Sequence, residues 1–114
     1  MRKAMSVIAR TAERLGFEAE EVLELILDFI DYSRGDIRGL REGLSSGNPS
    51  VVADHAHSIK GAALNLALDE IGTLASEIEK KGKAKALEGV NELIDAVDKL
   101  VEDLARSIET PSES

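Results

Sequence analysis

Residues 87–108, LEGVNELIDAVDKLVEDLARSI, decide the fold class of this chain. Apolar side chains recur there at alternating intervals of three and four residues: Leu87, Val90, Ile94, Val97, Val101, Leu104 and Ile108. That spacing places them on one side of an α-helix, whereas a half-buried strand would alternate every second residue. The stretch therefore predicts a long amphipathic helix that packs one face against other helices.

The same periodicity predicts four further helices toward the N-terminus, at residues 5–15, 22–44, 49–66 and 69–83. Gly16 is expected to end the first helix, while Asn48 and Asp69 are expected to cap the third and fourth. Short connections between long amphipathic helices make antiparallel neighbours. The predicted fold is all-α: an up-and-down antiparallel four-helix bundle, with the short N-terminal helix laid across one end. We expect one domain over residues 1–109 and a flexible tail at 110–114.

Two features of the helix at 22–44 fall outside its main apolar stripe. Its first half carries four extra apolar residues, Leu23, Leu25, Leu27 and Ile30. We therefore expect this half to be covered by other helices on more than one side. Gly35, Gly39 and Gly43 line one face further along. These glycines indicate either a flat surface for a partner helix or a loose, kinked region, and we favour the second.

Composition excludes several classes of function. The absence of cysteine excludes disulfides, thiolate metal sites and a cysteine nucleophile. A formal net charge of −8 argues against nucleic acid and against an anionic membrane surface, both of which attract cationic proteins. No stretch has the roughly 18 apolar residues of a membrane span. We therefore expect a cytoplasmic protein that binds neither nucleic acid nor membrane, and we also expect it to be a monomer.

The segment Asp54-His55-Ala56-His57-Ser58-Ile59-Lys60-Gly61-Ala62-Ala63 carries the candidate chemistry. At about 100° per residue, His57 lies off the buried stripe and should reach solvent, with Lys60 and Gly61 one turn along as its surface neighbours. Glycine inside a helix costs roughly 1 kcal/mol relative to alanine. Nothing in this alanine-rich helix explains that cost locally, so Gly61 is interpreted as a gap that gives access to the imidazole.

A neutral imidazole is available as a nucleophile near neutral pH, so the outer nitrogen of His57 can accept a phosphoryl group. The ammonium of Lys60 can then meet the phosphoryl oxygens as a point charge. The sequence contains no phosphate-binding glycine loop, zinc motif or serine nucleophile elbow. These observations predict a phosphocarrier with no ATP-dependent kinase site of its own.

The run His57-Ser58-Ile59-Lys60-Gly61-Ala62-Ala63, continued by Leu64-Asn65-Leu66, resembles the histidine-containing phosphotransfer domains of two-component signalling. The resemblance extends over nearly the whole chain. It implies that His57 is the phosphoacceptor, Lys60 the phosphate-facing lysine and Gly61 the access gap. It also implies a receiver domain of a response regulator or a sensor histidine kinase as partner, with Mg²⁺ held by the receiver. No cofactor is expected on this chain itself.

Two positions depart from the pattern of that family, and a third is assigned through it. Ala67 stands where many members have glycine, and Leu64 is larger than the usual small residue. Similar domains of chemotaxis kinases place a glutamate against the phosphoacceptor imidazole, and ungapped counting from His57 puts Glu79 at that position. The alternative interpretation is that Glu79 faces solvent and pairs with Lys83. Both interpretations stay open.

Two further residues near His57 receive an interpretation. His55 points to nearly the opposite side from His57, so it is predicted to be a partly buried, hydrogen-bonded histidine rather than a metal ligand or second acceptor. Leu64 shares the His57 side of its helix and is a candidate docking contact.

The leading functional interpretation is a relay of phosphoryl groups between phospho-His57 and the aspartate of a receiver domain. One alternative is the phosphoacceptor module of a chemotaxis-type histidine kinase. The other is a helical interaction bundle whose histidine is never phosphorylated.

Overall fold

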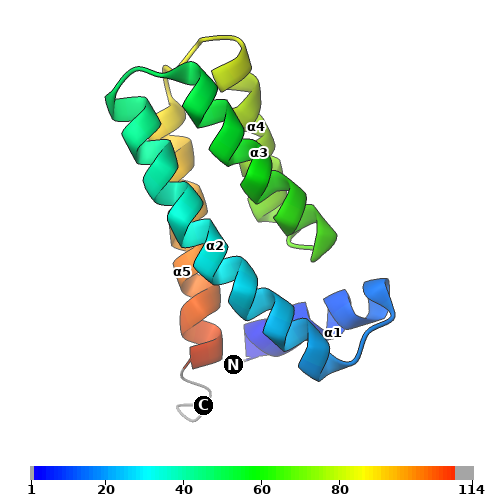
Figure 1. Ribbon diagram of the computed structural model, residues 1–114. Coiled ribbons are helices and arrows are strands. Elements are labelled where there is room, and N and C mark those ends of the chain that lie inside the picture. Colours follow the sequence, from blue (N-terminus) through cyan, green and yellow to red (C-terminus); the bar gives the residue numbers. More distant parts are fainter. Residues whose placement is uncertain (1, 110–114) are drawn as a thin grey trace.

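The computed structural model describes residues 2–109, with the side chains of residues 8–108, and is helical with short connections (Figure 1). Its helices are α1 (Arg2–Leu15), α2 (Ala19–Ser45), α3 (Pro49–Asn65), α4 (Asp69–Lys83) and α5 (Val90–Glu109). In the bundle α2 packs against α3, α3 against α4 and α4 against α5, and α5 also packs against α2. The short helix α1 contacts α2 and α5. The predicted four-helix bundle with an additional N-terminal helix is thereby confirmed, while the predicted tail at 110–114 lies outside the described residues.

The apolar stripes of the helices meet in one core. The main stripe of α5 is buried as predicted, and its members pack with residues of the other three long helices. The largest fully buried apolar side chains of this core are Ile26, Ile30, Leu40, Val22, Val52, Ile59, Ile78, Val90, Ile94, Val97 and Val101. None of the helices within residues 2–109 has the length and apolar character needed to cross a bilayer.

The helix α1 lies across the end of the bundle where α3 turns into α4 (Figure 1). The buried hydroxyl of Thr11 donates a hydrogen bond of 2.6 Å to the carbonyl oxygen of Leu66. The side chain of Arg14 forms an exposed ion pair of 3.2 Å with Asp69. These contacts tie α1 to the turn between α3 and α4 and cover that end of the core.

Three predicted helix starts and one predicted cap are wrong by a few residues. The helices α1 and α2 begin at Arg2 and Ala19, three residues before the predicted starts at residues 5 and 22. The last helix begins at Val90 rather than Leu87, because Gly89 has φ of +81° and breaks the helical path. Leu87 lies in the preceding turn, where it still packs against the core. Asp69 does not cap α4 but is its first residue; the cap position is Leu68, which has no capping side-chain hydrogen bond. A carboxylate in the first turn of a helix is still favourable toward the macrodipole.

The glycines of α2 do not mark a loose region, contrary to our expectation. A β-carbon at Gly39 would collide with the ring of His55, and one at Gly43 would lie 2.9 Å from the side chain of Val51. Both glycines are buried and let α3 approach the backbone of α2 closely. The partner helix is therefore α3 of the same chain.

The expectation that the first half of α2 is covered on more than one side is only partly met. Ile30 is buried, but Leu25 and Leu27 are more than one-third exposed. The helix α2 packs against α1, α3 and α5 and leaves its remaining face, with Leu25 and Leu27, to solvent.

Candidate functional site

The helix α3 presents His57 to solvent because its other face fills the core. Val52, Ala56 and Ile59 are almost completely buried, and the His57 side chain between them in sequence is 68% exposed. The helix starts as the sequence predicts, with Pro49 in the first turn and the Val51 N–H donating to the Asn48 side chain at 3.3 Å. This fixed start sets which face of α3 looks outward.

The helix α4 brings Glu79 against His57. The two helices approach closely because Gly82 has no side chain: a β-carbon there would lie 2.9 Å from backbone atoms of both Pro49 and Ala53. Glu79 is 6% exposed, and its Oε2 lies 2.8 Å from Nδ1 of His57. An ionised carboxylate can only accept, so Nδ1 carries the hydrogen. The second ring nitrogen, Nε2, therefore holds the free lone pair.

Two lysines share the Glu79 carboxylate with His57. Nζ of Lys60 lies 2.8 Å from Oε1, and Nζ of Lys83 lies 3.2 Å from Oε2. The hydrogen bond from Lys60 is the main cause that lowers the pKa of Glu79 to about 2, with smaller contributions from Lys83 and His57. Burial opposes this shift, because a low-dielectric surrounding disfavours the charged form. Glu79 is thus a carboxylate over the whole physiological pH range.

Gly61 is exposed on α3, four residues after His57. A β-carbon built at Gly61 would meet no atom within 4 Å, so nothing in the packing requires glycine here. Leu64, one turn further, is 48% exposed. Its side chain lies over Gly72 of α4, where a β-carbon would come within 2.6 Å of it. Gly61 therefore leaves open space on the His57 face, and Leu64 forms an apolar edge next to it.

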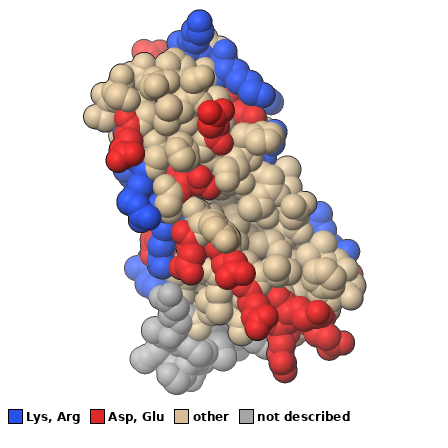
Figure 2. Space-filling view, viewed as in Figure 1, with Lys and Arg blue, Asp and Glu red and all other residues tan. Residues whose placement is uncertain are grey.

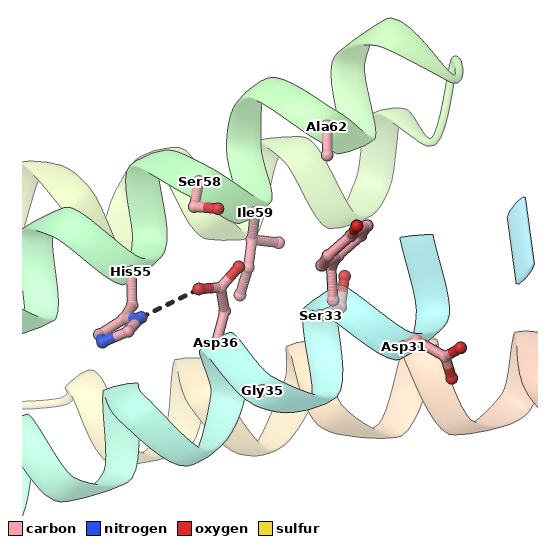
Figure 3. A pocket seen from close by; sticks show the side chains of 9 residues that line it. Asp31, Ser33, Gly35, Asp36, His55, Ser58, Ile59 and Ala62 are labelled. Atoms are coloured by element: carbon pink, nitrogen blue, oxygen red, sulfur yellow. Dashed lines mark hydrogen bonds and ion pairs between the residues drawn. The ribbon is translucent and has the colours of Figure 1, made fainter. Parts of the chain in front are cut away.

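His55 belongs to a different place, the groove between α2 and α3 (Figure 3). Its Nδ1 lies 2.9 Å from Oδ1 of Asp36, and its ring covers Gly39. The side chain is partly buried and hydrogen-bonded, as the sequence analysis predicted. Because the ring packs on the α2 backbone, His55 does not join His57 in one site.

The structure thus brings His57, Lys60 and Glu79 together and places Gly61 on the adjoining surface. Both interpretations of Glu79 hold in part, since it contacts His57 and Lys83 at once, yet it is buried rather than solvent-facing. Sequence reasoning missed that the Glu79 carboxylate also holds Lys60. The available signal was the position of Lys60 three residues after His57, on the same side of its helix and so within reach of a residue that contacts His57.

The described residues contain no group of three or more histidine, aspartate or glutamate side chains arranged to hold a metal ion.

Charge is distributed unevenly over the face shown in Figure 2. Positive side chains gather at the end of the molecule where α4 finishes, and acidic side chains gather at the opposite end, over the start of α2. The lysines of the last turn of α4 include Lys83, which pairs with Glu79 beside His57.

Comparison with known proteins gives a consistent result. The sequence profile of the Hpt domain family matches residues 24–107. No curated protein matches the chain significantly. Among solved structures, the chain is similar to the crystal structure of histidine-containing phosphotransfer protein B (HptB) from Pseudomonas aeruginosa PAO1. The TM-score is 0.73 at 22% sequence identity, with 87% of this chain and 84% of that chain covered, a likeness of fold. Since the family profile spans α3, α4 and most of α2 and α5, the chain belongs to the Hpt family of histidine phosphotransfer domains.

Proposed function

We propose that this domain carries a phosphoryl group on Nε2 of His57 and exchanges it with the aspartate of a receiver domain. The observation that supports this most is the contact of 2.8 Å between Nδ1 of His57 and the buried carboxylate of Glu79. It fixes the tautomer in which the exposed nitrogen, Nε2, has the nucleophilic lone pair. Lys60 keeps Glu79 ionised, so that the carboxylate continues to accept from Nδ1.

In the proposed transfer, the Nε2 lone pair attacks the phosphorus of an aspartyl phosphate on the partner. The N–P bond forms while the P–O bond to the aspartate breaks, and the aspartate leaves as a carboxylate. The ring keeps its Nδ1 hydrogen and becomes positively charged, next to the negative charge of Glu79. The reverse reaction returns the phosphoryl group to an aspartate. In this proposal Mg²⁺ is bound by the receiver domain and supplies charge neutralisation at the phosphoryl oxygens.

The surface around His57 suits an acceptor carried by another protein. His57 is mostly exposed, the space beside Gly61 is open, and Leu64 offers apolar contact area at its edge. A receiver domain must bring its aspartate within bonding distance of Nε2, which a bulky neighbour would prevent. We therefore assign Gly61 to access and Leu64 to docking.

The contact between Glu79 and His57 also favours a second candidate function. Among the related domains, those of chemotaxis kinases have a glutamate at this place, so the domain is also a candidate phosphoacceptor module of such a kinase. Both functions use phospho-His57 and differ in the donor. Phosphorylation by an ATP-bound kinase domain, without any receiver, would favour the second.

The test is transfer of labelled phosphate from a panel of phosphorylated receiver domains to the purified chain. We expect acid-labile label on the wild type and none on His57→Gln. His55→Gln is the matched control, since it removes the other histidine and should keep the label. Label on His57→Gln would refute the site, and no label on the wild type from receivers, kinases or phosphoramidate would leave the interaction bundle as the function.

A further inference from the structure

The Glu79 carboxylate holds two lysines in different ways. Lys60 has oxygen Oε1 to itself, at 2.8 Å, and its side chain is 29% exposed. Lys83 lies at 3.2 Å from Oε2, an oxygen that already accepts from His57, and its side chain is 70% exposed. The contact of Lys60 is therefore the shorter and better shielded one, whereas Lys83 can leave its contact with little loss.

The two lysines also differ in whether they line the groove beside His57. A groove beside His57 is lined by Ala53, Asp54, His57, Glu79 and Lys83. Lys83 is the cation among these lining residues, and Asp54 and Glu79 are the anions. A phosphoryl group at this groove meets two carboxylates, which repel it, and one ammonium, which attracts it. Lys60 is not among the residues that line the groove.

We propose that Lys83 is the residue that binds the phosphoryl oxygens on phospho-His57, while Lys60 remains on Glu79. The sum of the 3.2 Å and 2.8 Å contacts places Nζ of Lys83 at most 6.0 Å from Nδ1 of His57. The flexible stem of a lysine covers such a distance by changing rotamers. Glu79 loses one donor in this exchange and keeps two, Lys60 and the Nδ1 hydrogen. This inference rests on the proposed function and moves the phosphate-facing role from Lys60 to Lys83.

The test uses phosphoramidate as a small donor, so that no partner surface contributes. The His57 nitrogen displaces ammonia from phosphorus, which forms the N–P bond and breaks the P–N bond of the donor. We compare Lys83→Ala and Lys83→Arg with Lys80→Ala, which removes the same charge from an exposed position in the same last turn of α4. Thermal melting checks that all variants fold.

We expect Lys83→Ala to slow phosphorylation by about fivefold, the effect of an exposed charge-assisted contact, and Lys83→Arg to restore most of the rate. We expect Lys80→Ala to react like the wild type. The second readout is the pH titration of the ³¹P chemical shift of phospho-His57. Loss of a cation that touches the phosphoryl group should move the midpoint to higher pH, which a purely structural role of Lys83 would not do.

Equal rates and midpoints for Lys83→Ala and Lys80→Ala would overturn the inference and leave the proposed function intact. A midpoint that moves in Lys60→Ala but not in Lys83→Ala would also overturn it, because Lys60 would then be the contact. A wild-type chain that accepts no phosphate from any donor would overturn both the inference and the function.

Discussion

Substitution of Gly61 tests whether this glycine serves access to His57 or the packing of α3. The structure predicts that a larger residue there raises the stability of the fold and lowers the rate of phosphoryl transfer. The position is exposed within α3, and a β-carbon there meets no atom within 4 Å. Gly61→Ala should therefore gain the full difference in helix propensity, about 1 kcal/mol in the free energy of unfolding. For a domain of this size that gain raises Tm by about 4 °C. Gly61→Gln should keep most of the gain, since glutamine is also a good helix former.

The same glutamine fills the open space beside the imidazole. Transfer from a phosphorylated receiver domain requires the acceptor nitrogen and the phosphorus to approach closely, and a misplacement of about 1 Å can reduce a rate by about 100-fold. By the same steric argument, we expect Gly61→Gln to slow transfer from a receiver domain by roughly tenfold or more. Phosphorylation by phosphoramidate should change far less, because a small donor fits beside the new side chain.

The assay pairs thermal unfolding with both transfer rates for the wild type, Gly61→Ala and Gly61→Gln. Gly61→Ala serves as the control, since it has the stability gain without the bulk. A Gly61→Gln variant that melts below the wild type, or that loses both rates to the same extent, would refute the access argument. Either result would mean that glycine is needed for the structure of α3 itself.

Three further predictions concern stability. Because the folded-state pKa of Glu79 is about 2, below the ordinary 4.5, its ionised form stabilises the fold above about pH 4.5, and this contribution is lost as pH falls toward 2. Glu79→Gln should lose about 2 kcal/mol at pH 7 and show a flatter acid dependence in urea unfolding; an unchanged acid profile would contradict this. Lys85→Gly should raise stability by about 1 kcal/mol, measured by denaturant melts, because exposed Lys85 has φ of +58°. Gly39→Ala should cost about 2 kcal/mol or more in the same melts, since its β-carbon collides with the His55 ring; a stabilised variant would show that the ring moves freely.

Hydrophobic periodicity predicts well which side of a helix is buried and which is exposed, because this depends on the sequence of that helix alone. The alternation of three and four in α5 determines which side of that helix is buried, whatever it packs against. The same reasoning places His57 on the exposed side of α3, where the structure has it. The start of α5 was predicted too early because Leu87 continues the apolar spacing, although Gly89 ends the helical path. Apolar spacing reports burial, and a turn residue such as Leu87 can be buried outside a helix.

Contacts between helices were harder to predict, because they depend on how closely two backbones approach. The sequence alone favours a loose, kinked region at the glycines of α2, whereas Gly39 receives the ring of His55. The pair of His55 with Asp36 depends on this approach, and the two residues are 19 positions apart across the connection between α2 and α3. A glycine within a helix therefore has two opposite meanings, and only the partner helix distinguishes them: Gly39 is filled by a neighbour, and Gly61 is open.

Counting from His57 to Glu79 worked because the turn between α3 and α4 is short and tightly defined. Leu66, Ala67 and Leu68 form the whole connection, and the Leu68 N–H donates to the Ala63 carbonyl at 2.8 Å. Ala67 has φ of +61°, the left-handed conformation that glycine adopts without strain at the end of a helix. This explains why glycine suits the position in related domains, and it means that the alanine here costs about 1 kcal/mol. The turn keeps its geometry despite that strain, because Ala67 is buried under the end of the bundle that α1 covers. The contact of Thr11 with Leu66 thus helps to hold the register of α3 and α4, and with it the distance between His57 and Glu79.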